Sequence, residues 1–351
     1  MTRLGLLGLV ILPWMLGCER PALAVVKNAR SVMGTFAEVT AVAPDRATAQ
    51  RAVEAACTRL DDVNRLMSDY VADSEVGRLN ALPAGDGLVV SAETFHCLEQ
   101  GMRIAELSGG AFDMTCRPLV ALWKQAGRED RLPTEADLRQ TLARVGWRKL
   151  RLDPATRRVT PTVDRMQIDL GGIAKGYALD LAAEAMRAAG ATGGLVDVGG
   201  DVVAFGPRED GRPWRVGVKH PFQAGLLLTL SLTDRAVATS GVQQRFNTIA
   251  GRRYSHIVDP RTGHPAEQAP AVTVIAPDGL TADAWATAFS VLSVDEGAAL
   301  LEQTPLPGVE VMWVLPGPAG PVIRQTGGFA AYVVGAASMT PANPQSSEAA
   351  R

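Results

Sequence analysis

The sequence lacks any run of lysine and arginine residues that would make a basic patch. Its 35 basic and 37 acidic side chains leave a net charge of −2. A surface that binds nucleic acid needs clustered positive charge, so nucleic acid is not an expected partner. The sequence also lacks a self-similar repeat of about 20–50 residues, which excludes solenoid and propeller architectures.

Cysteine is scarce, and the four cysteines are Cys18, Cys57, Cys97 and Cys116. Their spacing matches no zinc-binding pattern, which excludes a zinc site built on cysteine. Cys18 belongs to the N-terminal segment, and the remaining three are odd in number, so at least one thiol has no disulfide partner. We expect all three to be small buried apolar residues.

The only long apolar run lies at the N-terminus, where residues 4–16 follow Arg3. This run is shorter than the roughly 20 residues that cross a membrane. A positive start followed by a short apolar stretch is typical of a secretory signal. We therefore expect an exported protein that faces the periplasm.

Two cleavage sites compete in this segment. Residues 16–18 (Leu-Gly-Cys) resemble a bacterial lipoprotein site, in which Cys18 is acylated and anchors the chain to the membrane, although Met15 stands where such sites usually carry leucine. Residues 22–24 (Ala-Leu-Ala) fit an ordinary signal peptidase. An uncleaved anchor helix is the third interpretation.

Apolar residues recur at helical spacing in residues 46–67, 91–107 and 134–146, with Ser91 as an expected N-cap. Further helices are predicted from the glycine turn to residue 189 and from Thr281 onward. Strands are predicted at 31–43, 166–170, 195–198, 202–205, 214–218, 226–232, 272–276, 309–315 and 322–325, with two shorter ones around a turn at 153–154.

These helices and strands come in clusters rather than in strict alternation, which predicts an α+β fold. Residues 25–30 read as a linker. We expect a signal segment over 1–24, one folded unit over 25–337 and a disordered tail over 338–351.

The most informative pattern lies in residues 169–180, where Gly171 and Gly172 end a predicted strand and a helix begins near Lys175. Free N–H groups and the dipole at a helix start favour phosphate oxygens. Lys175 places a positive charge at the positive end of this dipole, where a lysine is unfavourable. This position indicates an anion bound between the lysine and the start of the helix. A simple strand-to-helix turn with a solvated lysine is the alternative, because the pattern is neither a Walker A loop nor GxGxxG.

A second pattern places Asp283 and Thr287 one helical turn apart, on one face of a helix. A carboxylate and a hydroxyl are hard oxygen ligands, which suit a magnesium ion that keeps positions for substrate phosphates. The alternative is an acidic residue that favours the helix dipole beside a surface threonine.

Two turns complete the set. Residues 256–263 (His-Ile-Val-Asp-Pro-Arg-Thr-Gly) follow Thr239-Ser240-Gly241 and carry a strong turn signal, with His256 either a base, a phosphate contact or a structural residue. Residues 109–115 place Phe112 and Asp113 beside glycines, where a helix C-cap is the alternative.

In their order along the chain, these motifs resemble the ApbE family, the FAD:protein FMN transferases. The resemblance spans about residues 31–328. It is carried by Met33-Gly34-Thr35, Ser74-Glu75 with Leu79-Asn80, Gly110 to Asp113 with Thr115, Asp169 to Tyr177, Asp197 to Asp201, Thr239-Ser240-Gly241, His256 to Gly263, and Ala282-Asp283 with Thr287.

The resemblance implies an α+β fold of two intimate subdomains, with largely antiparallel sheet and with FAD in the cleft between them. It implies a magnesium ion held by the Gly172 carbonyl, Asp283, Thr287 and the FAD pyrophosphate. Family members often carry alanine or threonine at the Gly172 position, and a backbone ligand tolerates glycine there. The residues implied to line FAD are Met33, Tyr70, Ala111, Phe112, Asp113, Asp169, Lys175 and Ile257.

The implied reaction moves FMN from FAD onto a threonine or serine hydroxyl of an acceptor protein and releases AMP. His256 is the expected general base, and Lys175 is expected to stabilise growing charge. The expected acceptor is a membrane electron-transfer flavoprotein with an exposed Thr/Ser flavinylation motif. Two alternatives are an FAD pyrophosphatase that releases FMN and AMP, and a periplasmic FAD-binding lipoprotein without chemistry.

Overall fold

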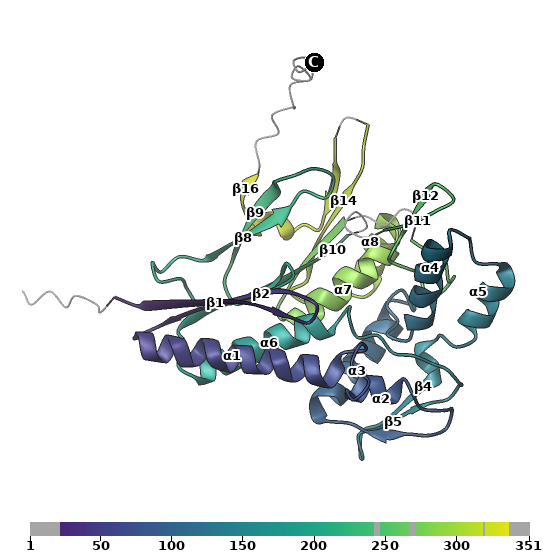
Figure 1. Ribbon diagram of the computed structural model, residues 1–351. Helices are drawn as coiled ribbons and strands as arrows, with labels where there is room; N and C mark the ends of the chain where they lie inside the picture. The colour runs from purple at the N-terminus through teal and green to yellow at the C-terminus, as the bar shows by residue number, and fades with distance from the viewer. Residues whose placement is uncertain (1–21, 242–245, 267–270, 319, 337–351) are drawn as a thin grey trace, which may run out of the picture.

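The computed structural model describes residues 22–241, 246–266, 271–318 and 320–336 and centres on one eight-stranded sheet (Figure 1). Every neighbouring pair of its strands is antiparallel. In spatial order the strands are β1 (Ala24–Val32), β2 (Thr35–Ala43), β6 (Gly193–Val198), β7 (Asp201–Phe205), β10 (Arg235–Ser240), β13 (Ala271–Ala276), β14 (Glu310–Leu315) and β15 (Val322–Gln325). The predicted α+β class with antiparallel sheet is confirmed.

The sheet buries both faces, because successive side chains of a strand point to opposite sides. One face packs against three helices, namely α1 (Arg46–Met67), α6 (Ala174–Ala188) and α7 (Gly279–Val291). The other face is covered by a small sheet of β8 (Trp214–Lys219), β9 (Leu226–Leu232) and β16 (Val333–Ala336). In β13, for example, Val274 joins the helical core and Ile275 joins the core under the small sheet.

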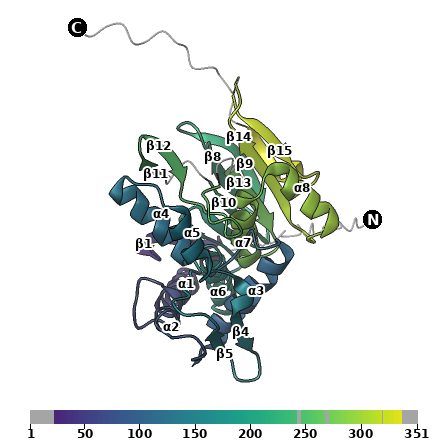
Figure 2. The same cartoon turned by 90° about the vertical axis from the view of Figure 1, so that its right-hand side faces the viewer.

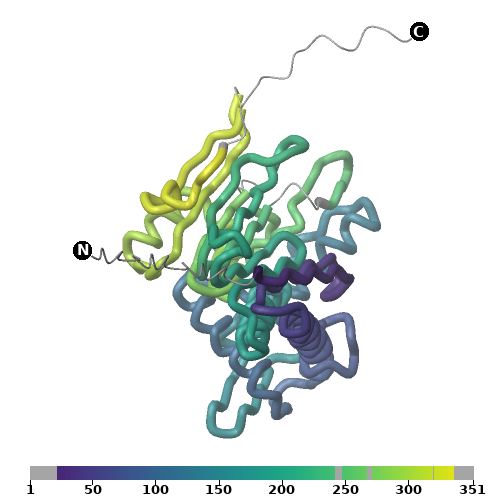
Figure 3. The backbone as a smooth tube through the Cα atoms, turned by 90° about the vertical axis from the view of Figure 1, so that its left-hand side faces the viewer, coloured from purple at the N-terminus to yellow at the C-terminus, as the bar shows by residue number. Residues whose placement is uncertain are grey.

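The longest helix, α1, has the bounds that its apolar spacing predicts. Asp45 caps it by accepting the Thr48 N–H at 2.8 Å. Its buried side chains, such as Leu60 and Val63, face β1, β2 and α6. Figure 3 shows this helix beside the N-terminal hairpin of β1 and β2.

The remaining elements lie around the central sheet, and η2 (Phe329–Tyr332) packs on the face that the small sheet covers. The others are α2 (Glu75–Leu79), β3 (Leu88–Val89), α3 (Ala92–Leu107), α4 (Arg117–Glu129), α5 (Glu135–Leu142), η1 (Trp147–Lys149), β4 (Leu150–Asp153), β5 (Arg158–Pro161), β11 (Phe246–Ile249), β12 (Arg252–Ser255) and α8 (Val294–Gln303). Figure 2 shows α4 and α5 next to the β11–β12 hairpin, with which they share a small apolar core. Ser91 caps α3 as predicted.

Two predicted elements are wrong. Residues 25–30 are not a linker, because they lie inside β1 and pair with β2 along their length. Residues 166–170 form no strand; the Asn80 side chain bonds the Ile168 N–H at 2.6 Å and the Ile168 carbonyl at 2.9 Å, in place of a neighbouring strand. The predicted helix from Thr281 is confirmed as α7, which begins two residues earlier at Gly279, and the unpredicted α8 follows it.

The third predicted helix, expected to reach residue 146, ends at Leu142 as α5. Its predicted start is right, because Thr134 and Asp137 form a reciprocal capping box. Among the described residues Cys57, Cys97 and Cys116 form no disulfide; the first two are buried as expected and Cys116 is partly exposed.

The predicted signal segment, including Cys18, and the predicted tail fall almost wholly outside the described residues and stay predictions. Within the described ranges, no helix combines the length and the apolar character needed to cross a membrane.

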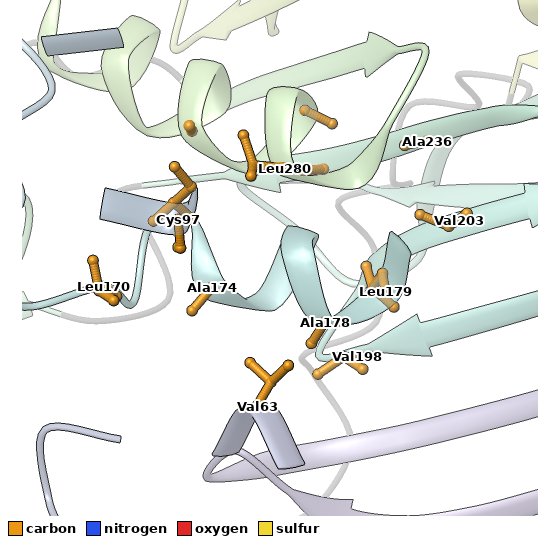
Figure 4. Close-up of a cluster of buried hydrophobic side chains, with 14 of the residues drawn as sticks. Val63, Cys97, Leu170, Ala174, Ala178, Leu179, Val198, Val203, Ala236 and Leu280 are labelled. Atoms are coloured by element: carbon orange, nitrogen blue, oxygen red, sulfur yellow. The ribbon is translucent and has the colours of Figure 1, made fainter. Parts of the chain in front are cut away.

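Helices α6 and α7 touch at their N-terminal halves, and their apolar contacts with the sheet are drawn in Figure 4. A Cβ atom on Gly176 would overlap the Gly279 carbonyl oxygen and would lie 2.8 Å from Asp283 Cβ. The Asp180 carboxylate of α6 accepts the N–H groups of Gly279 and Leu280 at 2.6 and 2.9 Å. Glycine and a capping carboxylate therefore fix the start of α7 against α6.

Replacing Gly176 with alanine should lower the free energy of unfolding by about 1–3 kcal/mol, because the new methyl group meets backbone that has no room to move. Gly101→Ala in α3 is the matched control, since its Cβ would meet only the flexible end of Met114. Alanine should there be neutral or should stabilise by up to about 1 kcal/mol. Urea unfolding of both variants measures this, and equal stabilities would contradict the packing argument.

The Asp180 carboxylate should make stability depend on pH. Burial raises its pKa to about 7, so the folded chain keeps a proton that the unfolded chain loses near pH 4. The melting temperature of the wild type relative to Asp180→Asn, which does not titrate, should fall as pH rises from about 4 to 8. Thermal melts across this range test the effect, and a difference independent of pH would refute it.

Candidate active site

The centre of the site is a lysine held between two buried carboxylates, where α6, α7 and β7 meet. Lys175 Nζ lies 3.2 Å from Asp283 Oδ1 and forms a short contact with Asp201 Oδ2. The second Asp283 oxygen accepts the Gly176 N–H at 3.0 Å, and the second Asp201 oxygen accepts the Thr239 N–H at 3.1 Å. Both carboxylate side chains are only 6% exposed.

Burial and ion pairing shift the pKa values of Asp283 and Lys175 in opposite directions. Burial raises the pKa of Asp283 to about 6, although the neighbouring Lys175 ammonium lowers it. Burial also lowers the pKa of Lys175, but Asp283 and Asp201 outweigh this and hold it above its ordinary value. Lys175 is therefore a fixed positive charge at neutral pH.

The three predicted metal ligands come together at this junction. A Cβ on Gly172 would lie 2.9 Å from the Thr287 hydroxyl oxygen, so the glycine turn touches α7 one helical turn beyond Asp283. The 172–176 segment thus contacts Thr287 at one end and Asp283 at the other.

The chemistry of this donor set fits magnesium, which takes carboxylate, hydroxyl and carbonyl oxygens and leaves positions for phosphates. Within the described ranges, no three histidine, cysteine or acidic side chains gather around a common point. A metal at Asp283 would therefore depend on few protein ligands and on oxygens from the substrate.

Hydrogen bonds within the protein shape the glycine turn and the start of α6. Asp169 Oδ1 accepts the Gly171 N–H at 2.7 Å, which folds the turn back on itself. The helix begins at Ala174, and Asp283 accepts the Gly176 N–H of its first turn. The positive end of the α6 dipole favours an anion at this end of the helix.

Four predicted flavin-lining residues belong to the structure around this turn. Ala111 and Phe112 are buried, and the Phe112 ring lies 3.4 Å from a Cβ position on Gly172. Asp113 accepts the N–H groups of Thr115 and Trp147 at 2.8 and 2.9 Å, and burial raises its pKa. Asp169 also has a pKa raised by burial, and its N–H donates to the Met114 carbonyl at 2.7 Å.

Two other predicted flavin-lining residues lie in exposed turns. Tyr70 is 84% exposed in the turn after α1. Met33 has a left-handed backbone, with φ of 52°, in the β1–β2 turn. The β6–β7 hairpin, which carries Asp201, joins this turn through the Gly199 N–H, which donates to the Phe36 carbonyl at 2.9 Å.

His256 and Ile257 follow β12 and are both half-buried. The Ile257 N–H donates to the Ser255 hydroxyl at 3.0 Å, and the following turn is closed by Arg261, whose side chain pairs with Asp259 at 2.8 Å. A Cβ on Gly110 would lie 3.7 Å from Arg261 Cγ. The turn that follows His256 therefore adjoins the loop of Ala111 to Asp113.

A cavity of about 500 Å³ lies elsewhere, between α3, α6 and the start of α7. It contains none of the predicted site residues, and its charged walls are used internally: Asp180 caps α7 and Arg187 pairs with Asp234 at 3.5 Å. The chemistry of the Lys175 centre identifies the candidate site better than the size of this cavity.

Sequence reasoning missed Asp201 as a site residue. The residue ends the motif Asp197 to Asp201, which entered the analysis only through the family resemblance. An acidic residue directly after two glycines in a tight hairpin is the available signal, but only the fold shows that this carboxylate meets Lys175.

Comparisons with known proteins agree with this geometry. The ApbE family model matches residues 33–313. An FAD:protein FMN transferase of Vibrio cholerae is 32% identical over 311 residues, which cover 87% of this chain and 92% of the relative. One of Treponema pallidum is 33% identical over 306 residues, which cover 82% and 84%.

Solved structures show the same likeness. The flavinyl transferase ApbE of Pseudomonas stutzeri, in its apo form, aligns with a TM-score of 0.77 at 32% identity over 88% of this chain and 97% of that one. The ApbE protein of Thermotoga maritima aligns with a TM-score of 0.78 at 32% identity, over 88% and 99%. The chain therefore belongs to the ApbE family, and the named relatives from Vibrio cholerae, Treponema pallidum and Pseudomonas stutzeri are flavin transferase enzymes.

Proposed function

We propose that this protein is a magnesium-dependent FAD:protein FMN transferase. The observation that supports the proposal most directly is the buried Lys175–Asp283 pair at the start of α6. A fixed cation at the positive end of a helix dipole suits a diphosphate, and a buried carboxylate with a hydroxyl one helical turn away suits magnesium.

The metal would be held by the Gly172 carbonyl, Asp283 and Thr287. When bound, magnesium supplies Lewis-acid polarisation of phosphoryl oxygens. Lys175 and the positive end of the α6 dipole would stabilise the charge that develops on the phosphate.

In the proposed reaction, a threonine or serine hydroxyl of the acceptor attacks the phosphorus on the riboflavin side of FAD. A new phosphorus–oxygen bond forms, the bond to the bridging oxygen breaks, and AMP leaves with that oxygen. His256 takes the proton of the attacking hydroxyl, because the imidazole side chain is a common general base in enzymes. FMN stays joined to the acceptor as a phosphoester.

The proposal also covers where the enzyme acts and which protein accepts the FMN. The apolar N-terminal run predicts export, and acylation of Cys18 would hold the enzyme at the membrane facing the periplasm. The acceptor would be a membrane electron-transfer flavoprotein with an exposed threonine or serine in its flavinylation motif.

One assay tests the reaction. The full chain is mixed with FAD, magnesium and an acceptor carrying an Asp-Gly-x-Thr/Ser-Gly-Ala-Thr segment, and a denaturing gel is read under ultraviolet light. A fluorescent acceptor band supports transfer. Free FMN and AMP without that band indicate an FAD pyrophosphatase, and intact FAD indicates a binding protein.

Asp283→Ala should abolish nearly all transfer and the response to magnesium, because the variant loses the one carboxylate of the proposed metal site. Asp295→Ala on α8, whose side chain is 91% exposed, is the control and should transfer like the wild type. Calorimetric titration with magnesium, in the presence of ADP, measures the magnesium affinity of each variant. Unchanged magnesium affinity in Asp283→Ala would remove this residue from the metal site.

His256→Ala should slow transfer by about 10²–10⁴-fold, which is what a general base typically contributes. FAD affinity should stay close to that of the wild type, since the histidine acts on the acceptor hydroxyl. His264→Ala, an exposed histidine eight positions later along the chain, is the matched control. Transfer at the wild-type rate in His256→Ala would exclude the residue as the base.

A further inference from the structure

Arg117 is a second cationic residue near the site, and its contacts differ from those of Lys175. Its Nε donates to Asp69 Oδ2 at 2.7 Å, and one terminal nitrogen donates to the Asp69 backbone carbonyl at 3.3 Å. The Asp69 side chain is 13% exposed and that of Arg117 is 26% exposed. A planar guanidinium that hydrogen-bonds to both the carboxylate and the backbone carbonyl of one residue holds the side chain and the backbone of that residue in place.

Asp69 directly precedes Tyr70, the exposed aromatic residue of the turn after α1. Several local hydrogen bonds also hold this turn: the Tyr70 N–H donates to the Ser68 hydroxyl at 3.4 Å, and the Ser74 N–H donates to the Val71 carbonyl at 3.1 Å. The Ser74 hydroxyl donates to the Ser68 carbonyl at 2.6 Å, while the Val71 N–H reaches the same carbonyl only at 3.4 Å. These contacts close the turn on itself, whereas Arg117 ties it to another element.

The element at the other end is the start of α4, which begins at Arg117 directly after the loop of Ala111 to Asp113. The Cys116 N–H donates to the Asp113 carbonyl at 3.2 Å. Asp169 is close enough for the charges of Asp69 and Arg117 to influence its pKa, although burial is the larger effect. Three segments that carry predicted flavin-lining residues therefore meet at the Arg117–Asp69 pair.

We propose that Arg117 is a positioning residue, which holds the Tyr70 turn in place through Asp69 and so preorganises the wall that faces the flavin end of FAD. The inference rests on the proposed function, because it assumes that Tyr70 contacts the flavin. Arg117 itself touches neither flavin nor phosphate in this proposal; its Nε and one terminal nitrogen donate to Asp69.

The ion pair should act on affinity rather than on folding. A turn that is loose in the free protein must be ordered when the flavin binds, and ordering one side chain lowers affinity by about 2–12-fold. A partly exposed ion pair contributes little to global stability. Loss of Arg117 should thus weaken binding of the flavin end and leave the melting temperature nearly unchanged.

The experiment measures dissociation constants of FAD, riboflavin and ADP for the full chain and for Arg117→Gln. We expect FAD and riboflavin to bind about 2–12-fold more weakly in the variant, with ADP affinity unchanged. Arg59→Gln is the matched control, because Arg59 is 30% exposed and pairs with Asp62 and Glu93 at 3.4 Å on the α1–α3 side. It should bind all three ligands like the wild type.

A double-mutant cycle tests whether Arg117 acts through the tyrosine. Tyr70→Ala should weaken riboflavin binding, and adding Arg117→Gln to it should change affinity by less than about twofold, the usual limit of additivity error. Asp69→Asn should reproduce the effect of Arg117→Gln, and the pair of substitutions should not be worse than either one.

Several outcomes would overturn the inference. Weaker ADP binding in Arg117→Gln would mean a direct phosphate contact, and an undiminished effect in the Tyr70→Ala background would mean a route other than the tyrosine. Unchanged riboflavin binding in Tyr70→Ala would remove the tyrosine from the site. These results leave FMN transfer by the wild type untouched, so the transfer assay separates failure of the inference from failure of the proposed function.

Discussion

The Lys175 ammonium between two buried carboxylates is the interaction on which the rest of the site depends. It joins β7, α6 and α7 at one point, because Asp201 begins β7, Lys175 lies in the first turn of α6 and Asp283 lies on α7. Buried charges are stable only when they are paired, and removing one partner leaves an uncompensated charge in the core. The pairing therefore fixes both the place of the lysine and the spacing of the elements that carry it.

Steric contact makes the same junction rigid. Gly176 allows α6 and α7 to approach until their backbones touch, and its N–H adds a hydrogen bond to Asp283. With Asp283 fixed, Thr287 is carried one turn along α7 to the glycine turn at Gly172. A hard-oxygen site is thus formed by helix geometry rather than by a mobile loop, which suits chemistry that consists mostly of positioning.

Much of this arrangement was predictable from sequence, and the failures have physical reasons. The bounds of α1 follow from apolar residues at helical spacing and from the Asp45 cap, which are local signals. Residues 166–170 looked like a strand because buried extended backbone has the same composition, yet their partner is the Asn80 side chain. No local pattern reports such a partner, since it lies 88 positions away in the sequence.

The site residues likewise divide into those that local sequence patterns indicate and those that only the fold explains. The glycine turn and the Asp283–Thr287 spacing are local patterns, so sequence indicated them, and family resemblance added Tyr70 and His256. Asp201 was missed because its meaning comes from the fold, which sets the β6–β7 hairpin beside α6. Lys175 was expected to face an external anion, whereas two carboxylates of the chain itself surround it.

The diphosphate end and the flavin end of FAD would contact parts of the protein that differ in rigidity. The diphosphate end would meet a buried centre whose every charged group is paired and whose backbone is packed. The flavin end would meet Tyr70, which is 84% exposed in a turn that a partly exposed ion pair ties to α4. Local stability is lowest where buried contacts are few, so the turn is the part that can adjust when a ligand enters. On this reasoning the buried centre determines the chemistry, whereas the Arg117–Asp69 contact sets how tightly the flavin is held.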